Sequence, residues 1–291
     1  MLVGPGDDAA AVRPRSRPLL LTTDSLIDGV HFRRGWASPA ALGRRAFAVN
    51  ASDVAAMGGA PRYALVALEV PARAPIAELD ALVAGFSTAA RRSGARLVGG
   101  NLARGPHLAI TVALVGEAPG RVVTRAGARA GDRLFVTGTL GATGLAVRRL
   151  MAGRGGKLPA VPVRVRQGIL LARAAHAMID VSDGLAQDVG HVCRASGVAA
   201  EIDLARLPVA AACRRALGER APLFAASAGE DYELLVAIPP RQPARLARLR
   251  LGCRLTEIGR VTRGRPGVRL LDSAGRPVRL PRGGFDHFGG G

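Results

Sequence analysis

Aromatic and sulfur-containing side chains are scarce in this chain of 291 residues. Aromatic residues make up only 3% of it, so the core must consist mainly of alanine, valine and leucine. The three cysteines lie far apart and form no Cys-x-x-Cys pair, which favours reduced thiols over a disulfide framework or a zinc site. The sequence contains no run of about 18 apolar residues and no signal-peptide pattern. We therefore expect a cytoplasmic protein that does not contact a membrane.

Acidic residues are also few, with 22 Asp and Glu against 41 Lys and Arg and a net charge of +19. Such a charge suggests nucleic-acid binding, and an RNA-binding or regulatory protein is one alternative, which predicts steeply salt-dependent affinity. However, the arginines are scattered, and there are few aromatic side chains on which bases could stack. We therefore expect a solvated basic surface that attracts small anionic substrates and has no nucleic-acid partner.

The hydrophobic pattern predicts an α/β (α+β) protein with two domains, because strand-like and helix-like segments alternate along a chain with 48% hydrophobic residues. A break at EAPGR (117–121) divides the alternation into residues 1–118 and 119–291. A hairpin is expected near Ser273–Gly275. Strands are expected at 19–21, 63–70, 95–101, 108–118, 133–138, 177–182, 233–239 and 255–261, and helices at 38–57, 76–93, 141–151, 164–177 and 185–196.

The helix over 38–57 poses a particular question. Ser38 and Pro39 are suited to begin it, and two glycines follow Met57. Leu42, Ala46 and Val49 form an apolar stripe along one face, and the next residue of that stripe is Asp53. A buried carboxylate without a partner is costly, so Asp53 should meet a cation or a hydrogen-bond donor.

The scarce acids gather in a few short stretches rich in glycine, serine or threonine. Nine of them lie in five such runs: Asp7, Asp8, Asp24, Asp28, Asp53, Asp180, Asp183, Glu230 and Asp231. We expect Asp24 in a polar turn after the 19–21 strand, and a Gly-Gly turn after the 95–101 strand. Asp180 and Ser182 would share one face of a strand.

Converging carboxylates repel one another, at a cost of about 4 kcal/mol for a pair ~4 Å apart at an effective dielectric of 20. An arginine or a hard divalent cation would relieve that repulsion. An all-oxygen donor set favours Mg²⁺, which is often held together with nucleotide phosphates. The sequence has no G-x-x-x-x-G-K-[ST] motif, so an ATP-using protein of this sequence would not be a P-loop enzyme.

Seven motifs resemble the signature runs of the thiamine-monophosphate kinase family, in the family's order and over nearly the whole chain. They are GPGDDAA (4–10), TTDSLIDGVHF (22–32), AVNASDVAAMGGAP (48–61), TRAGARAGDRLFVTG (124–138), IDVSDGLAQDVGH (179–191), AGEDYEL (228–234) and GFDHF (284–288). The resemblance implies the two-domain PurM-like fold of the aminoimidazole ribonucleotide synthetase superfamily. In that fold the N-terminal domains of a homodimer close a shared β-barrel, and a C-terminal α/β domain packs beside each.

The resemblance also implies ATP-dependent phosphorylation of thiamine monophosphate to thiamine diphosphate, with several Mg²⁺ ions. It assigns metal contacts to Asp7, Thr22, Thr23, Asp24, Asp53, Asn101, Asp180 and Asp183. It places Gly100, Asn101, Arg125 and Ser182 near ATP, and His31, Glu230 and Phe285 near thiamine monophosphate. The acceptor phosphate is largely ionised at neutral pH, since its second pKa is near ~6, so no general base is expected. Asp53 would then bridge metal ions where the two domains meet.

The sequence departs from the family pattern in two places. Asn101 stands where the family usually has an aspartate, and an amide oxygen binds Mg²⁺ without contributing negative charge. We therefore expect a weaker metal contact there, and a weakly active or inactive homologue is one alternative. A diverged member that phosphorylates another small molecule is a second. The chain also begins almost on the glycine loop, where family members carry a preceding helix, so we expect either a misassigned start or loss of that helix.

Overall fold

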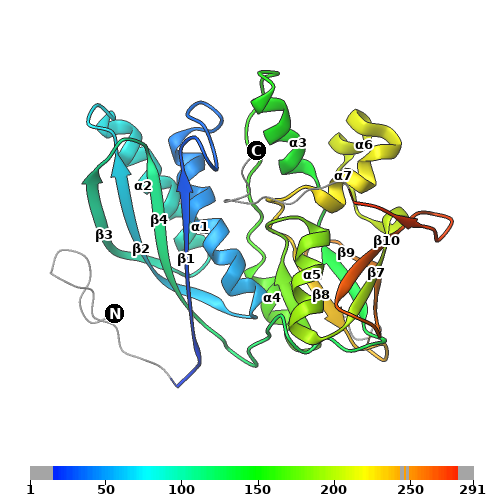
Figure 1. The fold of residues 1–291 in the computed structure, drawn as a ribbon. Helices are drawn as coiled ribbons and strands as arrows, with labels where there is room; N and C mark the ends of the chain where they lie inside the picture. The colour runs from blue at the N-terminus through cyan, green and yellow to red at the C-terminus, as the bar shows by residue number, and fades with distance from the viewer. Residues whose placement is uncertain (1–15, 243–245, 247–248, 281–291) are drawn as a thin grey trace.

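The computed structural model describes residues 16–242, 246 and 249–280, which form two lobes side by side (Figure 1). One lobe contains a four-stranded sheet, and the other contains a seven-stranded sheet. Helices pack against both sheets, so the α/β (α+β) class expected from the alternating pattern is confirmed. Among the described helices, none combines the length and the apolar character that crossing a bilayer requires.

The first lobe has the strand order β1-β4-β2-β3, in which only β2 and β3 run parallel. Its strands are β1 (Leu19–Ile27), β2 (Ala60–Val70), β3 (Arg96–Arg104) and β4 (Ala109–Glu117). The helices α1 (Pro39–Ala56) and α2 (Ile76–Arg92) pack together on one face of the sheet. Phe47 and Phe86 meet edge to face between the two helices, with ring centroids 5.5 Å apart. These few large side chains fill a core that is otherwise mostly aliphatic.

Two strands of this sheet are longer than the sequence pattern predicts. The polar turn expected after 19–21 is wrong, because β1 pairs with β4 without interruption as far as Ile27. The expected Gly-Gly turn is also wrong, because β3 continues beside β2 to Arg104. A Cβ at Gly100 would lie 1.9 Å from the carbonyl oxygen of Val66. Glycine therefore allows a close approach of two strand backbones here rather than a reversal of the chain.

Helix α1 begins and ends close to where the sequence predicts. The Oγ of Ser38 accepts a hydrogen bond from the N–H of Ala41, and Pro39 occupies the first turn. The helix ends at Ala56, and Gly58 follows in the left-handed region with φ of 75°. The predicted helix is therefore confirmed at both ends.

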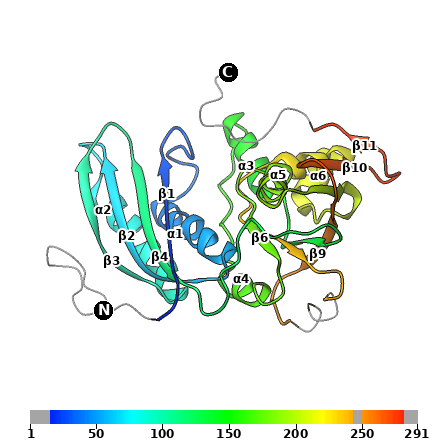
Figure 2. The same cartoon turned by 60° about the horizontal axis from the view of Figure 1, so that its bottom comes forward.

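Helix α1 belongs to the cores of both lobes, and it lies between them in Figures 1 and 2. Leu42 and Ala46 pack in the core of the first lobe, whereas Ala55 packs in the core of the second. Its neighbour there is α4 (Val165–Leu171), whose Gly168 permits close contact. A Cβ at Gly168 would lie 2.1 Å from the carbonyl oxygen of Ala55. Side chains on α1 can therefore reach any site formed where the lobes meet.

The second lobe has the strand order β11-β10-β7-β9-β5-β8-β6, with β10 and β7 as its one parallel pair among the described strands. Alternate residues of β5 (Arg133–Thr137) pack on opposite faces of the sheet. Leu134 and Val136 pack with α5 (Leu185–Ser196) and α7 (Ala221–Ser227). Phe135 packs with α4 and α1. The strands are β5 (Arg133–Thr137), β6 (Ala177–Asp180), β7 (Ala199–Asp203), β8 (Leu234–Ile238), β9 (Leu255–Thr262), β10 (Gly267–Leu271) and β11 (Pro277–Val278). The helices are α3 (Ala142–Met151), α4, α5 (Leu185–Ser196), α6 (Ala211–Leu217) and α7 (Ala221–Ser227), with 3₁₀ turns at Leu204–Arg206 and Gly218–Arg220.

The pattern of the second lobe was only partly predictable. The hairpin near Ser273–Gly275 is confirmed, because β10 and β11 pair antiparallel across it. The helix expected over 164–177 is too long, since α4 ends at Leu171. No element was expected at β7, α6 or α7. These segments are short, and tertiary packing rather than a long periodic pattern determines their structure.

Candidate active site

A cleft of about 590 Å³ lies between the two lobes. Side chains from β1, α1 and α3 line it, together with the turn after β1, the connection before β5, and the segments that follow β6 and precede β8. Eight of the residues assigned from the motifs line this cleft: Asp24, His31, Asp53, Arg125, Asp180, Ser182, Asp183 and Glu230. The fold therefore brings together side chains from all parts of the sequence.

The first acidic group consists of Asp24 on β1 and Asp53 on α1. Thr22 and Asp24 lie two apart on β1 and share one face of the strand. The Oγ1 of Thr22 donates a hydrogen bond to Oδ2 of Asp53, 2.6 Å away. Burial first and then the charge of Asp53 together raise the pKa of Asp24 to about 6. Burial also raises the pKa of Asp53, against the hydrogen bond from Thr22 and the charge of Arg125.

Asp180 ends β6 and approaches the same acids from the second lobe. It is buried, and its Oδ2 accepts a hydrogen bond of 2.7 Å from the Oγ of Ser52 on α1. Its pKa is raised to about 7, first by burial and then by the charge of Asp53, against the hydrogen bond from Ser52 and the charge of Arg125. The Asp53 and Asp180 carboxylates thus lie close enough to repel across the junction of the lobes. Ser52 was not singled out in the sequence, although it is adjacent to Asp53.

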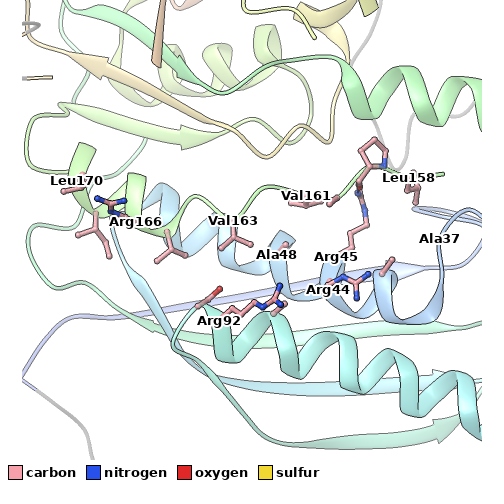
Figure 3. A pocket seen from close by; sticks show the side chains of 17 residues that line it. Ala37, Arg44, Arg45, Ala48, Arg92, Leu158, Val161, Val163, Arg166 and Leu170 are labelled. Carbon is pink, nitrogen blue, oxygen red and sulfur yellow. The ribbon is translucent and has the colours of Figure 1, made fainter. Parts of the chain in front are cut away.

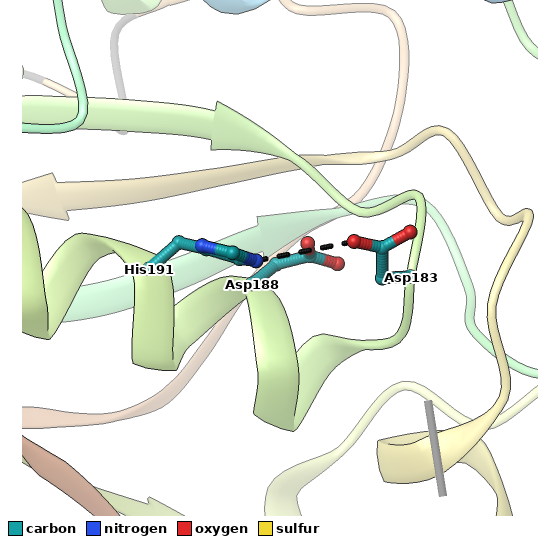
Figure 4. A group of neighbouring side chains, drawn as sticks. All are labelled: Asp183, Asp188 and His191. Carbon is teal, nitrogen blue, oxygen red and sulfur yellow. Dashed lines mark ion pairs between the residues drawn. The ribbon is translucent and has the colours of Figure 1, made fainter. Parts of the chain in front are cut away.

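A second acidic group lies at the start of α5, as Figure 4 shows. Ligand atoms of Asp183, Asp188 and His191 all lie within 4.8 Å of one another. The Nε2 of His191 is 3.9 Å from Oδ2 of Asp183. Burial raises the pKa of Asp188 to about 8, followed by the charges of Asp180 and Asp183. Asp188 and His191 were not predicted as site residues, but their spacing of three on a helix places them on one face.

The segment before β8 holds Glu230 in a restrained conformation. Glu230 and Tyr232 have positive φ values of 65° and 51°, which are unusual for residues other than glycine. Their N–H groups donate to the carbonyl oxygens of Ser182 and Val181, at 2.7 and 2.8 Å. These hydrogen bonds fix the segment to the chain that follows β6. Strained backbone held in this way is typical of functional sites.

Glu230 also has a buried partner that the sequence did not reveal. Its Oε2 accepts a hydrogen bond of 2.9 Å from the guanidinium of Arg45 on α1. Arg45 is only 4% exposed, and its guanidinium carbon lies 5.9 Å from the centre of the Tyr232 ring. Burial raises the pKa of Glu230, and the charge and hydrogen bond of Arg45 lower it. Arg45 therefore positions Glu230 at the wall of the cleft.

Two further polar residues have structural partners close to the cleft. The Nδ1 of His31 accepts the N–H of Ile27, 3.1 Å away, in the turn after β1. The Oδ2 of Asp231 accepts the N–H of Gly141, 2.8 Å away, at the start of α3. Burial raises the pKa of Asp231 to about 7. Asp231, unlike its neighbour Glu230, does not line the cleft and instead anchors a helix that does.

Several assigned residues are not brought into this cleft. Thr23 is exposed, and strand alternation turns its side chain away from Thr22 and Asp24. Gly100 and Asn101 lie on β3, at the opposite edge of the sheet from β1, and do not line the cleft. Asp7 and Phe285 fall outside the described residues. The assignments of these five residues therefore remain expectations.

The chemistry of the cleft fits a hard divalent cation. Asp24, Asp53, Asp180 and Asp183 offer carboxylate oxygens, and Thr22 adds a hydroxyl oxygen. No cysteine lines the cleft among the described residues, so the donors suit Mg²⁺ better than a soft metal. The raised pKa values of Asp24 and Asp180 show that these charges are poorly compensated by protein groups alone. Arg125 is the basic residue whose charge acts on both Asp53 and Asp180.

Comparison with known proteins matches nearly the whole chain. Residues 6–118 match the family described as AIR synthase related protein, N-terminal domain, and residues 129–271 match the corresponding C-terminal domain. The chain is 38% identical over 302 residues to the thiamine-monophosphate kinase of Escherichia coli (strain K12), covering 98% of this chain and 92% of that protein. It is 35% identical over 272 residues to that of Aquifex aeolicus (strain VF5), covering 89% and 86%.

Solved structures with the same fold include two with similar sequences. The thiamine-monophosphate kinase of Stenotrophomonas maltophilia K279a superposes with a TM-score of 0.85 at 36% identity, covering 92% of this chain and 90% of that chain. A structure described as AaThiL complexed with AMPPCP and TMP superposes with a TM-score of 0.81 at 36% identity, covering 97% and 91%. The likeness in three dimensions therefore includes both lobes and the cleft between them.

Proposed function

The chain belongs to the thiamine-monophosphate kinase family, and from this premise we propose that it transfers the terminal phosphoryl group of ATP to thiamine monophosphate. The product is thiamine diphosphate. The family resemblance read from the seven motifs is confirmed by curated relatives and by the PurM-like fold of solved neighbours. The main support for this reaction is that Asp24, Asp53, Asp180 and Asp183 line one cleft. Acids that served only solubility would lie apart on the surface, so this arrangement indicates a binding role.

The proposed transfer is direct and needs no general base. The acceptor is a phosphate oxygen that is already ionised near neutral pH, because the second pKa of a phosphomonoester is about 6. The main obstacle is the repulsion between two polyanions. Arg125 lines the cleft and acts on the carboxylates of both lobes, so its guanidinium is suited to hold a phosphate group in line.

Several Mg²⁺ ions are part of the proposal. Bound Mg²⁺ would neutralise phosphate and carboxylate charge and orient the phosphates. Among the described residues, Asp24, Asp53 and Asp180 would hold it where the lobes meet, with Thr22 beside Asp53 and Asp183 at a separate position. Asp7, Thr23 and Asn101 complete the set that the motifs suggest. The protein's own part is to hold these oxygens close together in spite of their repulsion.

The two substrates would occupy different parts of the cleft. ATP is assigned to Gly100, Asn101, Arg125 and Ser182, and thiamine monophosphate to His31, Glu230 and Phe285. Glu230 is a suitable contact for the cationic thiazolium ring, because Arg45 and the hydrogen bonds of its backbone fix its position. Burial raises the pKa of Glu230 and so disfavours its carboxylate form, whereas Arg45 lowers the pKa and favours that form.

Mass spectrometry of the product tests the proposed reaction. Purified protein with ATP, Mg²⁺ and thiamine monophosphate should yield thiamine diphosphate and ADP in equal amounts. Omission of Mg²⁺ should abolish the product. ADP formed with another acceptor, but not with thiamine monophosphate, would identify a diverged family member. No ADP with any acceptor would support an inactive homologue, in which Asn101 is the first residue to restore.

We also propose that residues 1–118 and 119–291 form the two domains, and that the first domain makes a homodimer through a shared β-barrel. The sheet of the first lobe has helices on one face, and its other face carries the exposed side chains Leu19, Leu21 and Leu65. Leu21 is 75% exposed and Leu19 is 51% exposed, which is unfavourable for a surface left in water. A cytoplasmic location, expected from three free cysteines, belongs to the same proposal.

Light scattering after gel filtration tests the dimer. The wild-type protein should have the mass of two chains, and Leu21→Arg should shift it towards one chain, because a charge would be buried in the interface. Arg17→Ala, on the exposed residues before β1, is a control that should leave the mass unchanged. A monomeric wild-type protein at micromolar concentration would overturn this part of the proposal.

A further inference from the structure

A groove lies away from the acidic cleft, on the other side of α1. Figure 3 shows it between α1, α2 and the segment that leads into α4. Its volume is about 810 Å³, which is within the range of small-molecule sites. No acid lines it, and its lining combines four arginines with apolar side chains such as Ala48, Val161 and Val163.

Three of the four arginines around this groove have no carboxylate to neutralise them. Arg44, Arg92 and Arg166 are exposed, and within the described ranges none of them forms an ion pair or a side-chain hydrogen bond. In Figure 3, Arg44 and Arg92 reach from the two neighbouring helices to the same side of the groove, and Arg166 lies at its far end beside Leu170. Free guanidinium groups around an apolar hollow are suited to an anion that also has an apolar part.

Arg45 makes the back wall of the groove and separates it from the cleft. Its guanidinium donates to the carbonyl oxygen of Pro159 at 3.2 Å and to Glu230 at 2.9 Å. Its buried Nε has no partner. The carboxylate that neutralises Arg45 belongs to Glu230 and lies on the cleft side of this wall. This arrangement leaves the groove without any counter-charge of its own among the described residues.

We propose that this groove binds a small organic phosphate with an apolar or aromatic body. The phosphate lies between Arg44 and Arg92, and the body packs on Ala48, Val161 and Val163. A doubly charged phosphate matches two converging guanidinium groups better than a single carboxylate does. The apolar lining explains why the site would prefer an organic phosphate to inorganic phosphate. This site is independent of the proposed kinase reaction.

Calorimetric titration of the full chain with 1-naphthyl phosphate tests the site. The Arg44→Ala/Arg92→Ala variant should bind it at least about tenfold more weakly, since it loses the charge-assisted hydrogen bonds to both guanidinium groups. The control is Arg91→Ala/Arg173→Ala, which removes the same charge from two exposed residues that do not line the groove. It should bind like the wild type. Arg125→Ala, which alters the acidic cleft, should also retain binding at the groove.

Two further probes separate the charge from the apolar body. 1-Naphthol and inorganic phosphate should each bind the wild type at least about tenfold more weakly than 1-naphthyl phosphate. Equal binding of 1-naphthyl phosphate to the wild type and the Arg44→Ala/Arg92→Ala variant would overturn the proposal. So would equal binding of 1-naphthol, because the arginines would then contribute nothing. Thermal melting checks that the variants are folded, which is expected because both arginines are exposed.

Discussion

Helix α1 contributes side chains to two cavities of opposite character. On the cleft side, Asp53 meets carboxylates from β1 and β6, and burial raises the pKa of each of them. On the groove side, Arg44 is exposed and its charge is solvated. In a chain with a net charge of +19, an arginine-lined groove is unsurprising, whereas a buried acidic cleft costs folding free energy. The buried acids of the cleft therefore need a bound cation to offset their repulsion, whereas the exposed arginines of the groove are solvated with or without a ligand.

One buried side chain separates the two cavities. Arg45 lies between them, and its guanidinium is the partner of Glu230 on the cleft side. The neighbouring Arg44 has no such partner among the described residues. Substitutions at these adjacent positions can therefore distinguish the two sides of the helix.

The largest effect is expected for Asp53→Asn. This change removes the carboxylate between the two lobes and should lower the rate of thiamine diphosphate formation by at least ~100-fold, because stabilisation of developing charge is lost. The metal-free variant should melt no lower than the wild type, since a neutral amide relieves repulsion with Asp24 and Asp180. Product formation by mass spectrometry and thermal melting measure the two effects.

Asp80→Asn is the matched control. It is the same substitution as Asp53→Asn, but Asp80 is exposed on α2 and lies outside the cleft. It should leave the rate within about twofold of the wild type, as surface substitutions usually do. A rate that is equally insensitive to Asp53→Asn would contradict the role of the cleft in the reaction.

Asp53 also shows how far the sequence could predict the site. Its helix, both ends of that helix and its inward direction follow from local patterns of capping and periodicity. Its partner Asp180 is 127 positions away in the sequence, and only the motif resemblance linked the two before the fold was known. Local patterns specify local structure, but contacts between lobes depend on tertiary packing.

The residues that the sequence missed share one physical property. Ser52, Arg45 and Asp188 act by hydrogen bonds or charge on a residue that was predicted, and each looks ordinary within its own helix. Conversely, Asp24 was expected in a turn, because Thr22-Thr23-Asp24 is polar, yet its pairing with β4 keeps it in a strand. Pairing partners of a strand lie far away in sequence, so polar strand residues near a site are easily mistaken for turns.

A second, smaller effect is expected from pH and Mg²⁺. The raised pKa values of Asp24, about 6, and Asp180, about 7, mean that the folded protein binds more protons than the unfolded chain above about pH 4. Unfolding free energy without metal should therefore fall as pH rises from about 4 to 7. Mg²⁺ needs ionised carboxylates, so its stabilising effect should grow over the same range.

Thermal melting between pH 5.5 and 8, with and without MgCl₂, measures this effect. The increase in melting temperature caused by Mg²⁺ should be at least about twice as large at pH 8 as at pH 5.5. The Asp180→Asn variant should lose part of this pH dependence, because Asp24 still titrates in the same range. A shift of the same size at every pH would show that the acids of the cleft are not the groups that bind the cation.

A more moderate effect is expected for Arg45→Lys. Lysine keeps the charge but cannot donate in the fork geometry that joins Pro159 and Glu230. Glu230 should be held less firmly, so KM for thiamine monophosphate should rise roughly fivefold while kcat changes by less than about twofold. Arg44→Lys is the adjacent control and should leave both constants unchanged. If the two variants behave alike, the two sides of α1 are not functionally distinct.

The smallest effect is expected for Asn101→Asp. Asn101 lies on β3 and does not line the cleft of a single chain. Asn101 can contact the metal only from a second copy of the chain or through bound nucleotide. In either case the added carboxylate should bind Mg²⁺ more strongly. The Mg²⁺ concentration needed for half-maximal activity should then fall by about threefold. Asn101→Ala should raise that requirement. Magnesium titrations of the initial rate compare the three proteins, and identical curves would mean that the acids gathered around α1 hold the metal without help from β3.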